Sequence, residues 1–232
     1  MAYVFAVPAQ PVVPVQGSSD LFPIHRIYCV GRNYAEHAKE MGFSGREPPF
    51  FFAKPADAAM PVPEGETGEM PYPPATRDLH HEMELVVALG KRGANIAAAD
   101  APSYIWGYAA GLDMTRRDLQ GEMKKQGRPW EIGKSFDFAA PIGPLKPVTK
   151  TGIVTAGRIQ LNVNGTRRQE SDLGKMIWNV NEIIEHLSKA WVLAPGDLIF
   201  SGTPEGVAAV EVGDTLVGRV DGVGTLELKI VA

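Results

Sequence analysis

The chain has 232 residues, of which 44% are hydrophobic, and its formal net charge at pH 7 is −4. This length and composition fit one large domain or one domain with a small appendage, and the negative charge provides no basic field that would attract nucleic acid or an anionic membrane surface. The single cysteine, Cys29, excludes an internal disulfide framework and favours a cytoplasmic setting, and no apolar run approaches the roughly 20 residues that a membrane span needs.

The N-terminal part predicts an arm rather than a domain. Residues 1–16 are apolar but interrupted by three prolines, and they contain no Lys or Arg, so they lack the basic region of a signal peptide. A polar turn follows at residues 16–20. We therefore expect an N-terminal arm over residues 1–24 and one main domain over residues 25–232.

The first strand of the main domain is expected at residues 24–30, and a helix at residues 34–41 with Asn33 as its cap. On that helix His37 and Glu40 are three positions apart, so they lie on one face. The pair is either an ordinary surface contact or a catalytic pair, and the local pattern leaves both open. Residues 48–54 predict an aromatic strand that ends in Lys54, and residues 56–78 predict a long loop.

Two glutamates occupy the beginning of an apolar strand at residues 80–90. Because side chains alternate along a strand, Glu82 and Glu84 share one face, while Met83, Leu85 and Val87 share the other and can pack into a core. Two adjacent carboxylates repel each other, and a hard divalent cation such as Mg²⁺ is a natural counter-charge. The alternative is a solvated strand face with Lys or Arg nearby.

A second apolar strand, over residues 105–112, ends at Asp113. Thr115 and Asp118 then have the spacing of a capping box, which predicts a polar helix on which Arg117 and Gln120 share a face. The carboxylates of Glu82, Glu84 and Asp113 could form one face of an octahedral Mg²⁺ or Mn²⁺ site.

The C-terminal half predicts further short strands and one helix. A hairpin with Asn-Gly at its turn is expected over residues 159–170, and an amphipathic helix over residues 175–189. A turn at residues 195–197 precedes a strand at 198–201, a tight loop at 202–206, and two final strands at 214–220 and 224–231. The resulting picture is an α+β protein that is mostly β.

The chain resembles the fumarylacetoacetate hydrolase family in several stretches that occur in the family's order. They are GRNYAEH (31–37), HEMEL (81–85), GY (107–108), DMTRRDLQ (113–120), GKSFD (133–137), GD (196–197) and SGTPEGV (201–207). Together they extend from about residue 25 to the end of the chain. Within the family, the likeness is strongest to bacterial members that cleave fumarylpyruvate.

The resemblance implies a fold, a set of site residues and an assembly. The fold would be the mixed β-roll or β-sandwich of the family's C-terminal domain, with flanking helices, in a cytoplasmic homodimer with a catalytic domain at residues 25–232. One Mg²⁺ or Mn²⁺ ion per subunit would be the cofactor. The implied roles are metal ligation by Glu82, Glu84 and Asp113, catalysis by His37, Glu40 and Lys134, and substrate contact by Arg32, Arg117, Gln120 and Thr203.

The resemblance also implies an activity, which is metal-dependent hydrolysis of the C–C bond of a 2,4-diketo acid. The expected reaction converts fumarylpyruvate to fumarate and pyruvate in gentisate breakdown. The same scaffold hosts other acylpyruvate hydrolases and oxaloacetate decarboxylation, because these reactions share an enolate. A non-catalytic protein that binds an organic acid is the alternative from another class.

Overall fold

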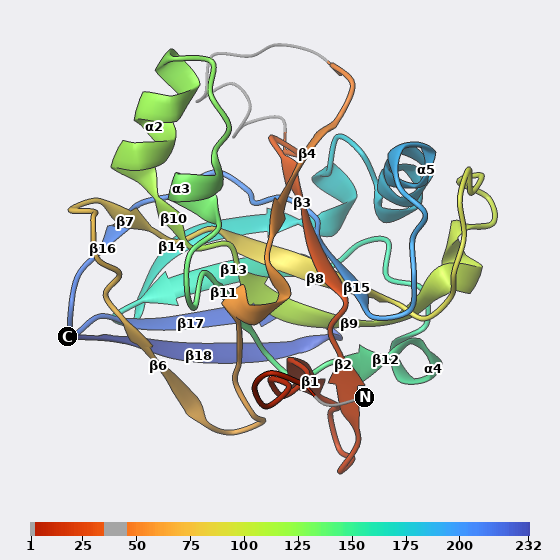
Figure 1. Cartoon of the computed structure of the whole chain (residues 1–232), viewed down its shortest axis with the longest axis horizontal. Coiled ribbons are helices and arrows are strands. Elements are labelled where there is room, and N and C mark those ends of the chain that lie inside the picture. Colours follow the sequence, from red (N-terminus) through yellow and green to blue (C-terminus); the bar gives the residue numbers. More distant parts are fainter. Residues whose placement is uncertain (1–2, 35–45) are drawn as a thin grey trace.

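The computed structural model describes residues 3–34 and 46–232. Two larger sheets dominate the fold, with the helices at their edges (Figure 1). The predicted fold class, mostly β with few flanking helices, is confirmed.

The larger sheet has eight strands, and the site lies on it. In spatial order its strands are β4 (Phe50–Lys54), β3 (Arg26–Gly31), β15 (Asp197–Phe200), β8 (Met83–Leu89), β9 (Ile105–Leu112), β11 (Ala140–Ile142) and β5 (Ala59–Pro61), with β12 (Lys146–Pro147) also pairing with β9.

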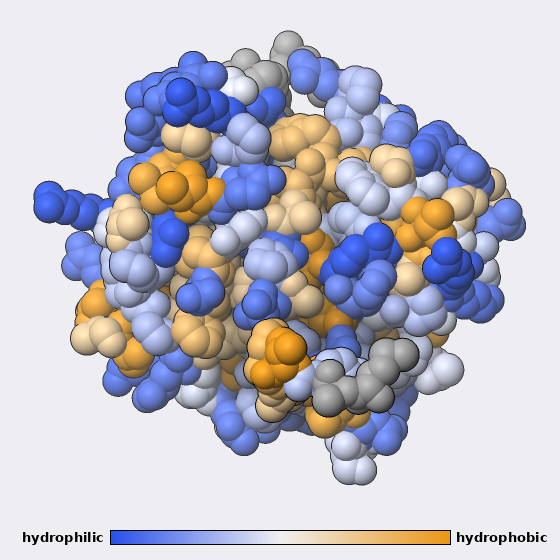
Figure 2. All heavy atoms as spheres, in the orientation of Figure 1, coloured by the Kyte–Doolittle hydropathy of each residue, from blue (hydrophilic) through white to orange (hydrophobic). Residues whose placement is uncertain are grey.

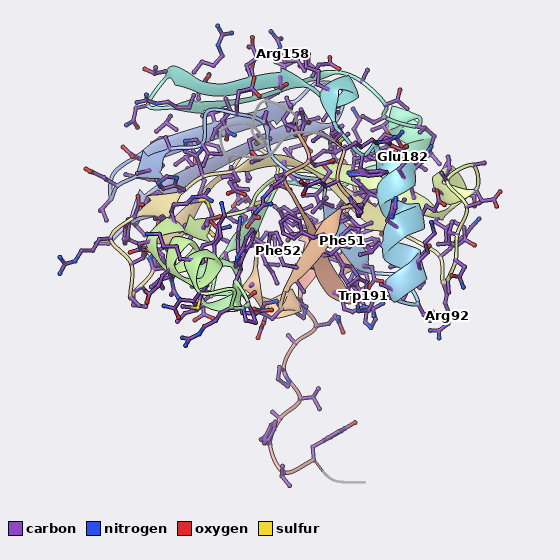
Figure 3. All side chains as sticks on the ribbon, turned by 90° about the horizontal axis from the view of Figure 1, so that it is seen from above. Phe51, Phe52, Arg92, Arg158, Glu182 and Trp191 are labelled. Atoms are coloured by element: carbon purple, nitrogen blue, oxygen red, sulfur yellow. The ribbon has the colours of Figure 1, made fainter. Side chains whose placement is uncertain are left out.

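The second sheet has five strands and packs against the first, as the stacked layers in Figure 3 show. Its order is β14 (Thr166–Asp172), β13 (Arg158–Val163), β17 (Thr215–Val220), β18 (Gly224–Val231) and β6 (Thr67–Pro71).

Two small sheets and several short helices complete the fold. The small sheets are β10 (Thr115–Arg116), β7 (Leu79–His80) and β16 (Ala209–Val210), and the hairpin β1 (Val12–Pro14) and β2 (Leu21–Pro23). In the described residues the α-helices are α2 (Arg117–Lys125), α3 (Glu131–Lys134), α4 (Val148–Thr151) and α5 (Val180–Ala190), and the 3₁₀ helices are Ala56–Ala58, Ala101–Tyr104 and Leu173–Lys175.

Strand β8 is buried on both faces along its whole length. Leu85 and Val87 face the main core between the two sheets. Val86 and Ala88 face a second cluster, in which Val13 of the N-terminal hairpin takes part. Alternate side chains of β8 therefore pack into two different apolar clusters.

Several predicted elements match the structure, and the hairpin is one of them. Asn164 and Gly165 at its turn have φ angles of 51° and 76°, the positive values that a type I′ turn requires. The strand at 105–112 has its predicted bounds in β9. The division of the chain at residue 24 stays a prediction.

Three local predictions were wrong. The expected loop at residues 56–78 contains β5 and β6, which form edges of the two large sheets through parallel pairing with β11 and β18. Thr115 does not open a helix but lies in β10, and α2 begins at Arg117 without a side-chain cap. The amphipathic helix begins five positions later than expected, at Val180, because Asn179 and Glu182 form a capping box there.

Candidate metal centre and substrate pocket

Three carboxylates converge at one end of the β8–β9 pair. Antiparallel pairing places Glu84 opposite Gly111, and the backbone N–H of Asp113 donates to the carbonyl of Glu82 at 2.9 Å. A ligand oxygen of each acid, Glu82, Glu84 and Asp113, lies within 4.8 Å of the others, and all three side chains are buried. One small cation bound at about 2.1 Å by each oxygen fits a group of this size.

The surroundings of Glu84 show whether a cation suits this group of carboxylates. Within the described part of the chain, its carboxylate accepts one hydrogen bond, from the backbone N–H of Gly202 at 2.7 Å, and no cationic side chain lies within ion-pair distance. Burial and the charges of Asp113 and Glu82 raise the pKa of Glu84 well above its usual value. A buried carboxylate of this kind needs a counter-charge, so the donor set fits Mg²⁺ or Mn²⁺.

The other two acids are paired with cationic side chains. The Nζ atom of Lys134 lies 2.8 Å from Oε2 of Glu82 and 2.7 Å from Oδ2 of Asp113. Arg117 pairs with Oε1 of Glu82, and Lys54 lies 2.8 Å from Oδ1 of Asp113. Each carboxylate oxygen has two lone pairs, so it can accept from a lysine or arginine and contact a metal ion as well.

Lys134 is a fully protonated donor in this setting. Burial lowers its pKa, but the carboxylates of Asp113 and Glu82 outweigh that effect, and the pKa lies above its usual value. Its ammonium group also donates to Oγ1 of Thr115 at 2.7 Å. Thr115 therefore contacts the site from β10 instead of capping the helix, whose N-cap position is Arg116.

Lys54 was not recognised as a site residue from the sequence. Its ammonium group is buried, pairs with Asp113, and donates to the carbonyl oxygens of Lys134 and Met114. It therefore fixes both a carboxylate of the centre and the backbone that carries Lys134. The sequence did contain a signal for Lys54, namely a lysine at the end of an aromatic strand. A lysine that is buried there needs a partner of opposite charge.

The loop after β15 is held by a residue from the other large sheet. Oγ1 of Thr203 donates to the carbonyl of Met83 at 2.9 Å and accepts from Nε2 of Gln169 at 2.8 Å. Oε1 of Gln169 accepts from the backbone N–H of Met83 and from Nδ1 of His81, both at 3.0 Å. Burial lowers the pKa of His81 to about 4, so the ring is neutral at pH 7. No sequence signal singled out Gln169, an isolated glutamine on a hairpin strand.

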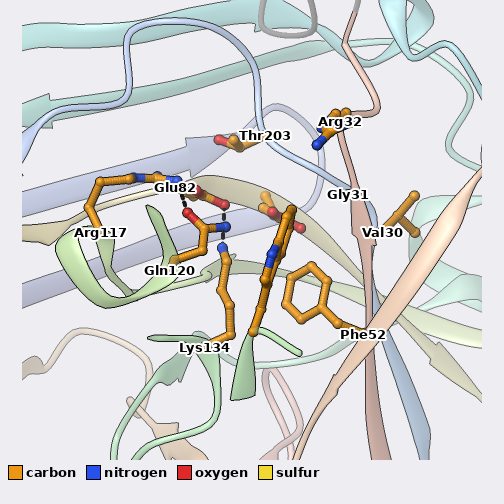
Figure 4. Close-up of a pocket in the computed structure, with 11 residues that line it drawn as sticks. Val30, Gly31, Arg32, Phe52, Glu82, Arg117, Gln120, Lys134 and Thr203 are labelled. Carbon is orange, nitrogen blue, oxygen red and sulfur yellow. Dashed lines mark hydrogen bonds and ion pairs between the residues drawn. The ribbon is translucent and has the colours of Figure 1, made fainter. Parts of the chain in front are cut away.

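A pocket opens directly over the carboxylates, with about 320 Å³ of empty space. Arg117, Gln120 and Lys134 approach Glu82 from α2 and α3 (Figure 4). NH1 of Arg117 donates to Oε1 of Gln120 at 2.6 Å, which leaves the amide NH₂ of Gln120 to act as a donor toward a ligand. The other lining residues are Val30, Gly31, Arg32, Phe52, Glu84, Trp130 and Thr203.

The structure thus brings together eight of the ten residues that the sequence suggested for the site. Seven line the pocket, and Asp113 belongs to the carboxylate group beneath it. His37 and Glu40 lie outside the described residues. The roles of all ten stay predictions.

Comparison with known proteins places this site in a family. The fumarylacetoacetate (FAA) hydrolase C-terminal family matches residues 26–231. The chain belongs to this family. The resemblance seen in the sequence motifs is therefore confirmed.

Individual family members extend the likeness over most of the chain. Fumarylpyruvate hydrolase from a Ralstonia species is 46% identical over 184 residues, covering 79% of this chain and 93% of that protein. The rat mitochondrial oxaloacetate tautomerase FAHD1 is 45% identical over 204 residues, covering 88% and 90%. The crystal structure of fumarylpyruvate hydrolase from Pseudomonas aeruginosa in complex with Mn²⁺ and pyruvate covers 99% of both chains, with 53% identity and a TM-score of 0.98.

Proposed function

We propose that this chain is a metal-dependent hydrolase that cleaves the C–C bond of a 2,4-diketo acid, and that its substrate is fumarylpyruvate. The products are fumarate and pyruvate. The observation that carries the proposal is the buried group of three acids beneath a pocket lined by Arg117, Gln120 and Lys134. The likeness to two fumarylpyruvate hydrolases, one with Mn²⁺ and pyruvate, supports it.

Glu82, Glu84 and Asp113 are the proposed ligands of one Mg²⁺ or Mn²⁺ ion per subunit. When bound, such an ion polarises a keto oxygen of the substrate and stabilises negative charge on it as a Lewis acid. The remaining chemistry belongs to side chains of the chain itself.

Binding of the dianionic substrate is assigned to the cationic lining of the pocket. The positive charges of Lys134 and Arg117 attract it, and the amide NH₂ of Gln120 offers a donor toward it, although the protein is negative as a whole. The hydroxyl group of Thr203 donates its proton to the carbonyl of Met83, so it has no hydroxyl proton left for the substrate. We therefore assign the contact between Thr203 and the substrate to atoms of Thr203 other than this proton. Arg32 lines the same pocket and is the fourth proposed substrate contact.

Water activation is assigned to His37, with Glu40 orienting its ring. His37 takes a proton from water, the oxygen adds to the C4 carbonyl, and Lys134 and Gln120 stabilise the charge that develops on the carbonyl oxygen. The C3–C4 bond then breaks with its electron pair moving to C3, which is protonated to give pyruvate. Each turnover consumes one water.

The experiment that tests the activity is a spectrophotometric substrate panel with and without added Mg²⁺ or Mn²⁺. We expect fumarylpyruvate to lose its diketone absorbance and release fumarate only when the metal is present. Preferential turnover of acetylpyruvate would indicate another acylpyruvate hydrolase, and release of carbon dioxide from oxaloacetate would indicate a decarboxylase. Metal-dependent binding of these acids without turnover of any of them would indicate a non-catalytic protein that binds organic acids.

We predict that His37→Ala loses at least about 100-fold in kcat, the low end of what a general base contributes, while Mn²⁺ still binds in calorimetry. Activity of the unmodified protein should fall at acidic pH, because a base must be unprotonated to accept a proton and an ordinary histidine protonates near pH 6.5. Turnover of the variant at the unmodified rate would remove His37 from the mechanism.

Oxaloacetate chemistry is the second candidate, and one observation favours it. The likeness to the rat oxaloacetate tautomerase is as close as the likeness to the Ralstonia hydrolase, at 45% and 46% identity. A tautomerase moves a proton without cleaving a C–C bond. Enol-to-keto conversion of oxaloacetate in the same panel would therefore identify it.

We further propose that the chain acts as a cytoplasmic homodimer in gentisate breakdown. The buried free thiol of Cys29 agrees with a reducing compartment, and in the described residues no helix is both long and apolar enough to cross a membrane. Apolar side chains lie in the middle of the face in Figure 2, over β3 and β4, and could pack against a second subunit. Sedimentation velocity of the purified protein tests the dimer.

A further inference from the structure

A second pocket continues outward from the one over the carboxylates. It is an open depression of about 830 Å³, including the solvent above it, and shares Arg32, Phe52 and Trp130 with the inner pocket. Arg128 and Phe50 are among the residues that line only the outer part. The two pockets therefore adjoin each other, with Arg32, Phe52 and Trp130 at their common boundary.

Flat aromatic rings form a wall along these pockets. The rings of Phe50 and Trp130 meet edge to face with centroids 5.3 Å apart, and Phe52 lies 6.0 Å from Trp130. Nζ of Lys134 lies 5.1 Å from the ring centre of Phe52, and Phe52 lines both pockets. Aromatic walls of this kind favour a planar, conjugated group.

The outer pocket carries cationic groups although the chain is negative overall. Arg32 stacks over Phe50 with its guanidinium carbon 5.1 Å from the ring centre. Arg128 lines the same space from the turn that follows α2, where its backbone N–H donates to the carbonyl of Met123 at 2.9 Å. Among the described residues that line the pocket, Arg32 and Arg128 are positive and Glu131 is negative.

The pKa of Lys124 also responds to these positive charges. Burial lowers the pKa of Lys124, and the charges of Arg32 and Arg117 lower it further. The boundary of the two pockets therefore attracts anions.

We propose that the outer pocket holds the acyl half of the diketo acid and that Arg128, together with Arg32, binds a carboxylate at the far end of that acyl group. This inference rests on the proposed function and deepens it. The ligand class is an acylpyruvate whose acyl part is planar and ends in a carboxylate, as in fumarylpyruvate. A neutral acyl group, as in acetylpyruvate, would reach the inner pocket without using Arg128.

The test compares fumarylpyruvate with acetylpyruvate in four proteins: the unmodified chain, Arg128→Gln, Arg128→Lys and the control Arg92→Gln. The control removes one positive charge from an exposed position well away from Phe52 and β4 (Figure 3). We expect Arg128→Gln to lower kcat/KM for fumarylpyruvate about tenfold, mainly through KM, because one charge-assisted hydrogen bond is lost. For acetylpyruvate the change should stay within about twofold, and Arg128→Lys should recover part of the loss because it keeps the charge.

Product inhibition gives a readout that a general structural effect would not change selectively. In Arg128→Gln the inhibition constant of fumarate should rise, whereas that of pyruvate should not. If the unmodified chain turns over both substrates and Arg128→Gln lowers both equally, this inference is overturned and the proposed function stands. If the unmodified chain turns over neither with metal present, the proposed function fails and this inference fails with it.

Discussion

Among the three acids, Glu84 has surroundings that oppose its charge most strongly. Glu82 and Asp113 are paired with lysine or arginine, whereas Glu84 receives only the N–H of Gly202 within the described residues. Its pKa is raised by burial first and then by the two neighbouring carboxylates. A carboxylate in such surroundings destabilises the metal-free fold and becomes favourable when a cation binds. Functional sites commonly lower the stability of the fold in this way.

We predict that Glu84→Gln stabilises the metal-free protein and weakens Mn²⁺ binding. The folded state raises the pKa of this acid, so the stability of the metal-free protein falls as the pH rises above the unfolded-state value, and the neutral variant avoids this fall. At pH 7 in EDTA, calorimetry should show a melting temperature at least about 2 °C higher for the variant.

Titration calorimetry should show Mn²⁺ affinity reduced by about 100-fold or more, because a charged ligand oxygen is replaced by a neutral one. Glu69→Gln, on β6 and outside the carboxylate group, is the matched control. A variant that melts lower than the unmodified protein in EDTA, or that keeps its Mn²⁺ affinity, would contradict the assignment of Glu84.

At the scale of elements, the site depends on how separate strands are joined. Arg117 reaches Glu82 because the start of α2 is tied to the residue before β7: the N–H of Arg117 donates to the carbonyl of Asp78 at 2.8 Å. Asp118 strengthens this connection by accepting from the hydroxyl of Thr76 at 2.6 Å. A short strand pair and one acidic side chain therefore set the direction of a substrate-binding arginine.

Gln169 performs the corresponding task between the two large sheets. Its side chain binds Thr203 and Pro204 after β15, and it binds His81 and Met83 on either side of Glu82. Four groups converge on one amide, which matches its full capacity of two donors and two acceptor positions.

We predict that Gln169→Leu leaves these groups without partners and lowers the free energy of unfolding by about 1–3 kcal/mol. Because the loop that carries Thr203 loses its anchor, KM should rise as well. Denaturant unfolding and steady-state kinetics measure the two effects. Gln160→Leu, on β13 and only partly buried, is the control. Unchanged stability together with unchanged KM would show that the loop holds its position without Gln169.

At the scale of the whole molecule, the N-terminal segment extends away from the body (Figure 3). Tyr3, Val4 and Phe5 are 79%, 95% and 73% exposed. Burial of these apolar side chains against another protein surface would remove them from water and is therefore favourable. A second copy of the chain would supply that surface in the proposed homodimer.

We predict that deleting residues 2–9 raises the dimer dissociation constant at least about tenfold, since burial of roughly 50–60 Å² of apolar surface is worth 1.4 kcal/mol. Sedimentation velocity over a concentration series measures it. A chain of full length in which Tyr3 and Phe5 are replaced by Ser separates the loss of apolar contact from the loss of length. If the shortened chain dimerises as tightly as the full one, the segment has no part in assembly.

The sequence by itself determined the features that depend on local patterns. The two glutamates predicted to lie together do so, although β8 begins only at Met83 and Glu82 precedes it; the apolar run at residues 105–112 delivered Asp113, and Asn164-Gly165 specified a tight hairpin. These predictions succeeded because each depends on the backbone geometry of neighbouring residues.

The tertiary structure alone decided which distant groups meet. Strand β6 pairs in parallel with β18, some 160 positions later in the chain, so an apparent loop became a sheet edge. Thr115 lies in β10, paired with β7, instead of capping a helix, and Lys54 and Gln169 acquired their roles only through partners on other elements. A local pattern shows what a residue can bind, but burial and the partners available in the fold decide what it does bind.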